Sequence, residues 1–261
     1  GIRLNSNINF DKKDKIYYGK TRVLYPKNQF YFEHKLKKKV LSIYNSNIVN
    51  NSFKGELLGE VALMPFFFFD LKLNINNFGF TKFFNNTFKK NENFLAKFIP
   101  FNKKINGNLK INIEEIKSSS RIISSANTSL EFKNGDVITK EIVLNFNKFG
   151  TTKIVGKILE QKNKKIFYFD SITNITNPKI FYSRFLIPKR KRTIIKPIKL
   201  IGNINLNTYA VALEKLYYNE QLDNELMLDL NEIINNSISQ NTRKNFFDQS
   251  NLRKIVQFLF K

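Results

Sequence analysis

The chain has 261 residues, a formal net charge of +23 and 27 phenylalanines. Hydrophobic residues make up 42% of it, which excludes a disordered chain, and its apolar runs stop well short of the roughly 20 residues of a membrane-spanning helix. It contains no cysteine, which excludes disulfides and thiolate metal sites. The lysine excess fits nucleic acid, an anionic lipid surface or a codon bias, so charge alone identifies no partner.

Residue 1 is Gly, and the first residues lack the basic flank and apolar block of a signal peptide. We therefore expect the chain to be a piece of a longer protein, with any export signal or anchor lying upstream.

Strands are the first elements expected along the chain. Alternating runs at residues 20–25 and 29–33 are separated by Pro26-Lys27-Asn28, a combination typical of a turn. The basic run that follows, residues 35–39, is most simply a solvated strand edge, where lysine discourages edge-to-edge pairing; the alternative is a phosphate-binding patch. The aromatic run 66–69 is expected in the core rather than at a ligand site.

The most regular pattern lies between residues 105 and 158. Leu109, Ile111 and Ile113 alternate with polar residues, which is the two-residue period of a strand with one apolar and one solvated face. Asn134-Gly135 between two such runs is the strongest short-range hairpin signal, because both central residues of the favoured turn need positive φ. The segment is therefore predicted to be an antiparallel meander.

Two further patterns divide the chain. Gly59, Gly107 and Gly202 are each followed by a polar residue and then by an alternating run. This pattern indicates a loose repeat in which each glycine opens a new run of strands. Beyond Leu206 the apolar spacing changes to that of two amphipathic helices. We therefore predict an antiparallel β region with loose Gly-headed repeats at 1–206 and a mostly helical C-terminal cap at 207–261.

The sequence contains no recognisable catalytic constellation. His34 is the single histidine, and its strand neighbours Glu33 and Lys35 point to the opposite face. The close carboxylate pair Glu114-Glu115 is likewise split between two faces. Phosphate-binding glycine loops, metal-binding histidine pairs and nucleophile motifs are missing from the sequence. We therefore expect neither an enzyme nor a bound cofactor or metal.

Long amphipathic strands need a cover for their apolar face. Few helices are expected before residue 220, which leaves a second sheet, a sheet closed on itself, or an open curved sheet whose apolar concave side holds a ligand. In the last arrangement, lysines would lie at the rim of a groove. Strand alternation then gives the candidate lining residues: Leu109, Ile111, Ile113, Leu130, Phe132, Ile142, Leu144 and Phe146.

The pattern of strands around Gly107, Gly135 and Gly156 resembles the C-terminal region of AsmA-like proteins over residues 53–206. The resemblance implies a mainly β fold with a long, curved antiparallel sheet, open as a groove or folded like a taco, and here followed by C-terminal amphipathic helices. It also implies a Gram-negative envelope protein in the periplasm, anchored in the inner membrane by an N-terminal helix that this chain lacks.

The family's proposed activity is the non-enzymatic passage of phospholipid towards the outer membrane. Phospholipid is thus the expected ligand, and the resemblance leaves room for an outer-membrane or periplasmic protein partner. The high lysine content, Thr151, Thr152 and the helical tail depart from the family pattern, so ligand and endpoint stay open.

Two alternatives from other classes remain. A basic nucleic-acid-binding module would use residues 35–39 and 189–192 with nearby Tyr and Phe, but the chain lacks a recognisable fold motif or the Arg-rich, aromatic-interleaved surface of single-strand binders. Nucleic acid is accordingly not the expected partner. A structural envelope β domain would instead have a fully packed interior and no ligand.

Overall fold

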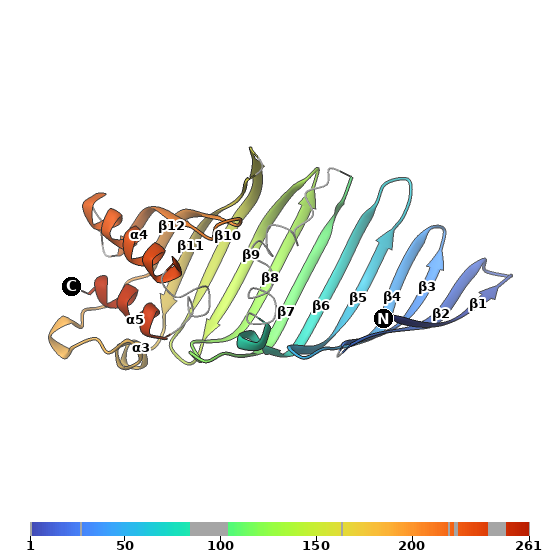
Figure 1. Cartoon of the computed structure of the whole chain (residues 1–261), viewed down its shortest axis with the longest axis horizontal. Coiled ribbons are helices and arrows are strands. Elements are labelled where there is room, and N and C mark those ends of the chain that lie inside the picture. Colours follow the sequence, from blue (N-terminus) through green and yellow to red (C-terminus); the bar gives the residue numbers. More distant parts are fainter. Residues whose placement is uncertain are drawn as a thin grey trace.

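A computed structural model describes residues 2–26, 28–83, 104–162, 164–218, 220–221, 224–239 and 249–260. These residues form one open sheet of fourteen strands whose order in space follows their order in the chain, with helices gathered at the C-terminal end (Figure 1). This confirms the predicted mainly β fold with a long open sheet and C-terminal helices.

The strands are β1 (Arg3–Asp11), β2 (Ile16–Tyr25), β3 (Asn28–Lys37), β4 (Val40–Val49), β5 (Phe53–Ala62), β6 (Phe68–Gly79), β7 (Asn106–Lys117), β8 (Ile123–Lys133), β9 (Asp136–Phe146), β10 (Gly150–Gln161), β11 (Lys164–Ile175), β12 (Ile198–Asn205), β13 (Val211–Tyr218) and β14 (Glu220–Gln221). The helices near the C-terminus are α3 (Pro178–Phe185), the short 3₁₀ helix η1 (Lys189–Lys191), α4 (Asn224–Ser239) and α5 (Gln249–Phe258). Residues 80–83, directly after β6, are helical as well.

Two-residue turns close several of the hairpins. Asn134 and Gly135 join β8 to β9 with φ of 54° and 95°, as the sequence predicts. Lys38 and Lys39 form the equivalent turn between β3 and β4, with φ of 47° and 68°. The basic run is therefore not a strand edge, because β3 is paired on both sides, with β2 and with β4.

One pair of neighbouring strands breaks the antiparallel pattern. β6 and β7 run parallel, with Leu71 beside Leu109 and Ile75 beside Ile113. A parallel pair needs a connection that returns the chain to the end where the first strand began, and residues 80–105 make it. The sheet is therefore two antiparallel blocks, β1–β6 and β7–β14, joined side by side.

The glycines of the predicted repeat do not hold equivalent places. Only Gly107 stands at the start of a strand, whereas Gly59 and Gly202 lie inside β5 and β12. Gly156 and Gly202 instead sit at register shifts, where a Cβ atom would come within 2.2 Å and 2.5 Å of a carbonyl oxygen on the next strand. At Gly202 the close approach and the register shift involve the same neighbour, β13, whereas Gly156 comes close to β11 and has its shift against β9. Glycine is thus required by close strand approach, and the bulges bend and twist the sheet.

The helical end contains most of the fully buried large side chains; Val137 on β9 is the exception. Leu216, Leu230 and Ile187 are at most 2% exposed, and all three lie in clusters that include α3, α4 or α5. α3 begins after Asn177, whose side-chain oxygen accepts a hydrogen bond from the Ile180 N–H, and has Pro178 in its first turn.

The boundary predicted at residue 206 does not coincide with the end of the sheet. β13 and β14 continue the sheet beyond it, and α3 precedes it. The sequence indicated α4 and α5 but not α3, which is eight residues long and has only a short apolar pattern.

Candidate functional site

The strand register places the eight candidate lining residues on one face of the sheet. Residues directly opposite each other on paired strands share a face, and Ile111 lies opposite Thr128, which lies opposite Ile142. The next row is Ile113, Ala126 and Leu144. The remaining members, Leu109, Leu130, Phe132 and Phe146, follow from the same register, and all eight side chains are half-buried.

The same face is apolar along the whole sheet, and we call it the apolar face. Towards the N-terminus the register adds Leu4, Ile8, Phe10, Val23, Phe30, Phe32, Ile43, Leu57, Leu71, Leu73 and Ile75. Towards the C-terminus it adds Ile154, Ile158, Phe167, Phe169, Leu200, Ile204, Leu213 and Leu216. Hydrophobic side chains thus pass from strand to strand, with single polar residues such as Thr21, Ser46 and Ser171 among them. The same alternation places Glu115 and Lys117 on this face where β7 ends.

The opposite face is more polar, and ion pairs connect its side chains between neighbouring strands. Ion pairs join Lys153 to Glu141 at 3.5 Å and Lys199 to Asp170 at 3.0 Å. This contrast between the faces is what the period-two alternation in the sequence requires.

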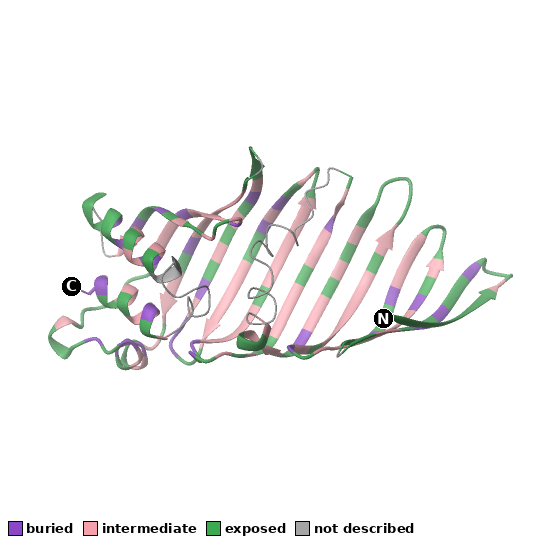
Figure 2. Ribbon diagram, viewed as in Figure 1, coloured by how far each residue is buried: buried purple, intermediate pink, exposed green. Residues whose placement is uncertain are grey.

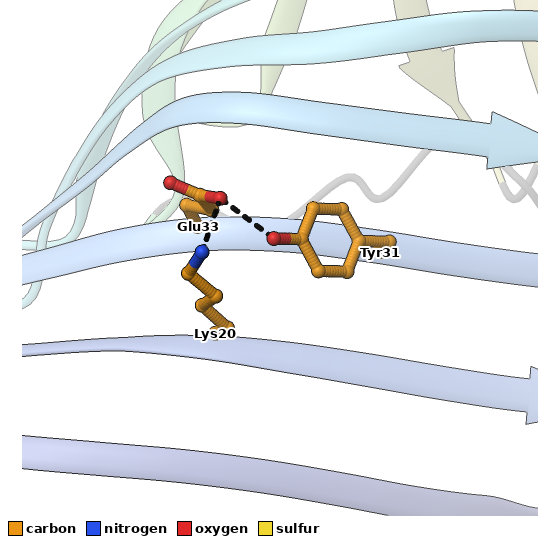
Figure 3. Close-up of polar contacts among 3 residues, drawn as sticks. All are labelled: Lys20, Tyr31 and Glu33. Carbon is orange, nitrogen blue, oxygen red and sulfur yellow. Dashed lines mark hydrogen bonds and ion pairs between the residues drawn. The ribbon is translucent and has the colours of Figure 1, made fainter.

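Lys20, Tyr31 and Glu33 form a polar cluster on this second face (Figure 3). Tyr31 Oη donates a hydrogen bond to Glu33 Oε1 at 2.6 Å, and Lys20 Nζ lies 3.1 Å from the same oxygen. The Tyr31 hydrogen bond, followed by that from Lys20, lowers the pKa of Glu33, and the hydrogen bond to Glu33 raises the pKa of Lys20. The cluster therefore holds its charges and ties β2 to β3, which suits a structural role.

His34 lies on the apolar face, opposite the charged cluster. Its side chain is 8% exposed, its Nδ1 has no hydrogen-bond partner, and its ring centroid is 5.4 Å from that of Phe32. Within the described ranges, no group of three His, Cys, Asp or Glu residues could hold a metal ion.

The two basic runs do not form a common surface. Residues 35–39 lie at the hairpin between β3 and β4, while η1 follows α3 at the other end of the strands, beyond β11 (Figure 1). Arg192 is also occupied locally, because its Nε donates to Ile187 O at 3.0 Å and its guanidinium lies 5.4 Å from the Tyr182 ring centroid. A nucleic-acid site that uses both runs has no support in this geometry.

Helices cover the apolar face at its C-terminal end. Met227, Leu230 and Ile234 of α4 form a buried cluster with Leu213 and Leu216 of the sheet. At the N-terminal end, Leu4, Ile8 and Phe10 of the same face are 64%, 57% and 48% exposed. Figure 2 shows β1 almost wholly exposed, while buried positions occur both at the helical end and on β2, β3 and β4.

The aromatic run contradicts its predicted place in the core. Phe66 and Phe67, in the connection from β5 to β6, are 78% and 38% exposed, and Phe68, the first residue of β6, is 44% exposed. Of the run, only Phe69 joins the apolar face. The signal that could have indicated this is Pro65, which interrupts the apolar run just before the phenylalanines.

No helix in the described part of the chain is long and apolar enough to cross a bilayer. No family model matches the chain, and no significantly similar protein was found among curated proteins or solved structures. The resemblance to AsmA-like proteins is therefore carried by the sequence pattern alone.

Proposed function

We propose that the chain is a non-enzymatic lipid-binding and lipid-transfer segment of a Gram-negative envelope protein. The acyl chains of phospholipids lie against the apolar face while their head groups stay in water, and lipids move along the sheet between the inner and outer membranes. The observation that carries this proposal is the apolar face itself, which continues from strand to strand opposite a polar face.

The dimensions and chemistry of the face fit a passive conduit. Neighbouring strands are about 4.8 Å apart, so fourteen strands span roughly 60 Å across the strand direction. Each methylene group removed from water contributes about 0.8 kcal/mol, so a single acyl chain gains a substantial binding energy. Since the side chains along the face are similar, many shallow sites allow a lipid to slide rather than be held at one place.

Bound lipid is tested by native mass spectrometry of the chain purified from a Gram-negative host, followed by extraction and identification of small molecules. Ile111→Asp and Leu144→Asp place a charge on the apolar face and are expected to abolish lipid occupancy. The matched control is Val155→Asp, because Val155 lies on the polar face and is 48% exposed. Circular dichroism and thermal unfolding establish that each variant is folded.

Loss of folding in both apolar-face variants, with a ligand-free wild-type mass, would identify the face as ordinary core and favour a structural domain. Tight, salt-sensitive oligonucleotide binding by a lipid-free chain would favour the basic module instead. Retention of lipid by folded Ile111→Asp and Leu144→Asp would also overturn the proposal.

A further inference from the structure

We propose that the β3–β4 turn and the β5–β6 connection together form a contact site for an anionic lipid bilayer. We call this site the basic–aromatic tip and define it by Lys38, Lys39, Leu63, Met64, Phe66 and Phe67. It extends the proposed function by naming the surface that meets a membrane, and it is argued from different residues.

The apolar half of the tip is exposed to an unusual extent. Leu63 and Met64 are 47% and 55% exposed, and Phe66 is 78% exposed. The sequence between Glu60 and Asp70 contains no charged residue. Several large apolar side chains gathered on one exposed connection mark an interaction site rather than ordinary surface.

The basic half lies directly beside the apolar half. The Leu63 N–H donates a hydrogen bond to Lys39 O at 2.9 Å, which fixes the β5–β6 connection against the β3–β4 turn. Lys38 and Lys39 are both exposed. Cations are thus held next to the apolar side chains at one end of the strands, which is the upper edge of the sheet in Figure 1.

The backbone of the turn fixes where the two lysines stand. Lys38 and Lys39 both adopt positive φ, a conformation that lysine disfavours. The β8–β9 hairpin makes the same two-residue turn with Asn134-Gly135, the residues that such a turn prefers. Lys15, Lys148 and Lys162 also adopt positive φ at other turns, so this turn differs from them by the exposed apolar connection beside it rather than by its backbone.

An anionic bilayer is the partner whose chemistry matches both halves. Aromatic and aliphatic side chains bury their surface at the boundary between head groups and acyl chains, while lysines beside them attract anionic lipids by about 1 kcal/mol each. Nucleic acid would use the charge but leave Met64 and Phe66 in water. A bilayer contact would also place one end of the strands next to a source or acceptor of lipid.

The test is flotation of the 261-residue chain with phosphatidylcholine vesicles, with and without phosphatidylglycerol. We expect binding to the anionic vesicles that weakens as salt is added. Phe66→Ser combined with Phe67→Ser removes the apolar contact and is expected to weaken binding by tenfold or more. Lys38→Asn combined with Lys39→Gly removes two charges while installing the preferred turn, so it keeps the fold and is expected to lose about thirtyfold in affinity and part of the salt dependence.

Matched controls come from the other end of the strands. Ile194→Ser removes an apolar side chain that is 88% exposed, and Lys189→Gln with Arg190→Gln removes two exposed charges from η1. Both variants are expected to bind vesicles as the wild type does. Equal loss of binding in the controls, unchanged binding in the tip variants, or no vesicle binding by the wild type would overturn the proposal.

The proposal for the basic–aromatic tip and the proposal for the apolar face can be tested separately. Tip variants are expected to keep any co-purified lipid, and Ile111→Asp is expected to keep vesicle binding. Vesicle binding without bound lipid would support the tip and count against the lipid-binding face, whereas bound lipid without vesicle binding would do the reverse.

Discussion

The two edges of the sheet differ in how the backbone groups of their outer strands are hydrogen-bonded. At the C-terminal edge, the amide side chains of Asn231 and Asn235 on α4 bind the backbone of β13. At the N-terminal edge, β1 pairs with β2 alone among the described strands. One edge is therefore closed by a helix, whereas β1 has no second strand beside it among the described residues.

The asparagine contact imitates a neighbouring strand. Asn235 accepts from the Val211 N–H at 2.9 Å and donates to Val211 O at 2.7 Å, and Asn231 does the same for Leu213 at 2.7 Å and 3.0 Å. Residues four apart on a helix are separated by about 6.0 Å along its axis, and residues two apart on a strand by about 6.6 Å. Two asparagines four apart can therefore serve alternate residues of an edge strand.

β1 carries little of the protection usual for edge strands. It contains no proline or lysine, and its pairing with β2 has no bulge. Leu4 and Ile8 of β1 lie on the apolar face and are nevertheless 64% and 57% exposed. The difference shows that the closed edge is a feature built by particular side chains, since the sheet by itself leaves its edge open.

The largest expected effect on this contrast is the loss of packing at the closed edge. Leu230→Ala removes a side chain that is 1% exposed and is expected to lower the free energy of unfolding by about 2–5 kcal/mol. Ile8→Ala, at a position that is 57% exposed, is the matched change at the open edge and is expected to cost much less. Denaturant unfolding followed by circular dichroism measures both, and equal costs would contradict the asymmetry.

A smaller effect is expected when the backbone contact alone is removed. Asn235→Ala leaves the Val211 N–H and C=O without their partner, which costs about 1–3 kcal/mol. Asn236→Ala is the matched control, because Asn236 is exposed and its amide bonds to Glu232 within the same helix. If the two variants unfold at the same denaturant concentration, the asparagine contact does not stabilise the edge.

Hydrogen exchange sharpens the comparison without a mutation. The amides of Val211 and Leu213 are expected to be protected, because each donates to an asparagine oxygen. In β1, alternate amides face away from β2 and are expected to exchange rapidly. Asn231→Ala should speed exchange at Leu213 and leave β1 unchanged, whereas uniform protection across β1 would show that its free edge is covered.

The smallest effect concerns acid stability near the open edge. The pKa of Glu33 is lowered in the folded chain, so its stabilising contribution is present above the unfolded pKa, about 4.3, and is lost as pH falls through the lower folded value. Glu33→Gln is therefore expected to be less stable than wild type at neutral pH and to lose this difference in acid. Glu115→Gln breaks a pair with Lys117 within a single strand and serves as the control in the same pH series of thermal unfolding.

Much of this architecture follows from the sequence because its signals are local. The two-residue period fixes which side chains share a face, so Ile111 and Leu144 were correctly assigned to one side, and Asn134-Gly135 encodes its own turn. Whether that face binds lipid is a separate question that alternation does not answer.

The features missed by the sequence analysis depend on contacts between distant segments. The parallel pairing of Leu71 with Leu109 joins strands whose connection has no strand pattern, and Asn231 reveals its partner only when α4 lies along β13. The Lys38-Lys39 turn was missed for another reason: it lacks the usual turn residues, so only the backbone dihedral angles identify it.

The parallel pairing of β6 with β7 also has a consequence for how the chain folds. Within each block, many neighbouring strands are joined by short turns, so their pairing closes small loops and can begin early. Leu71 and Leu109 are far apart in the chain, and bringing them together closes a longer loop at a higher entropic cost. The two antiparallel blocks are therefore expected to form as separate folding units, with the seam between them closing last.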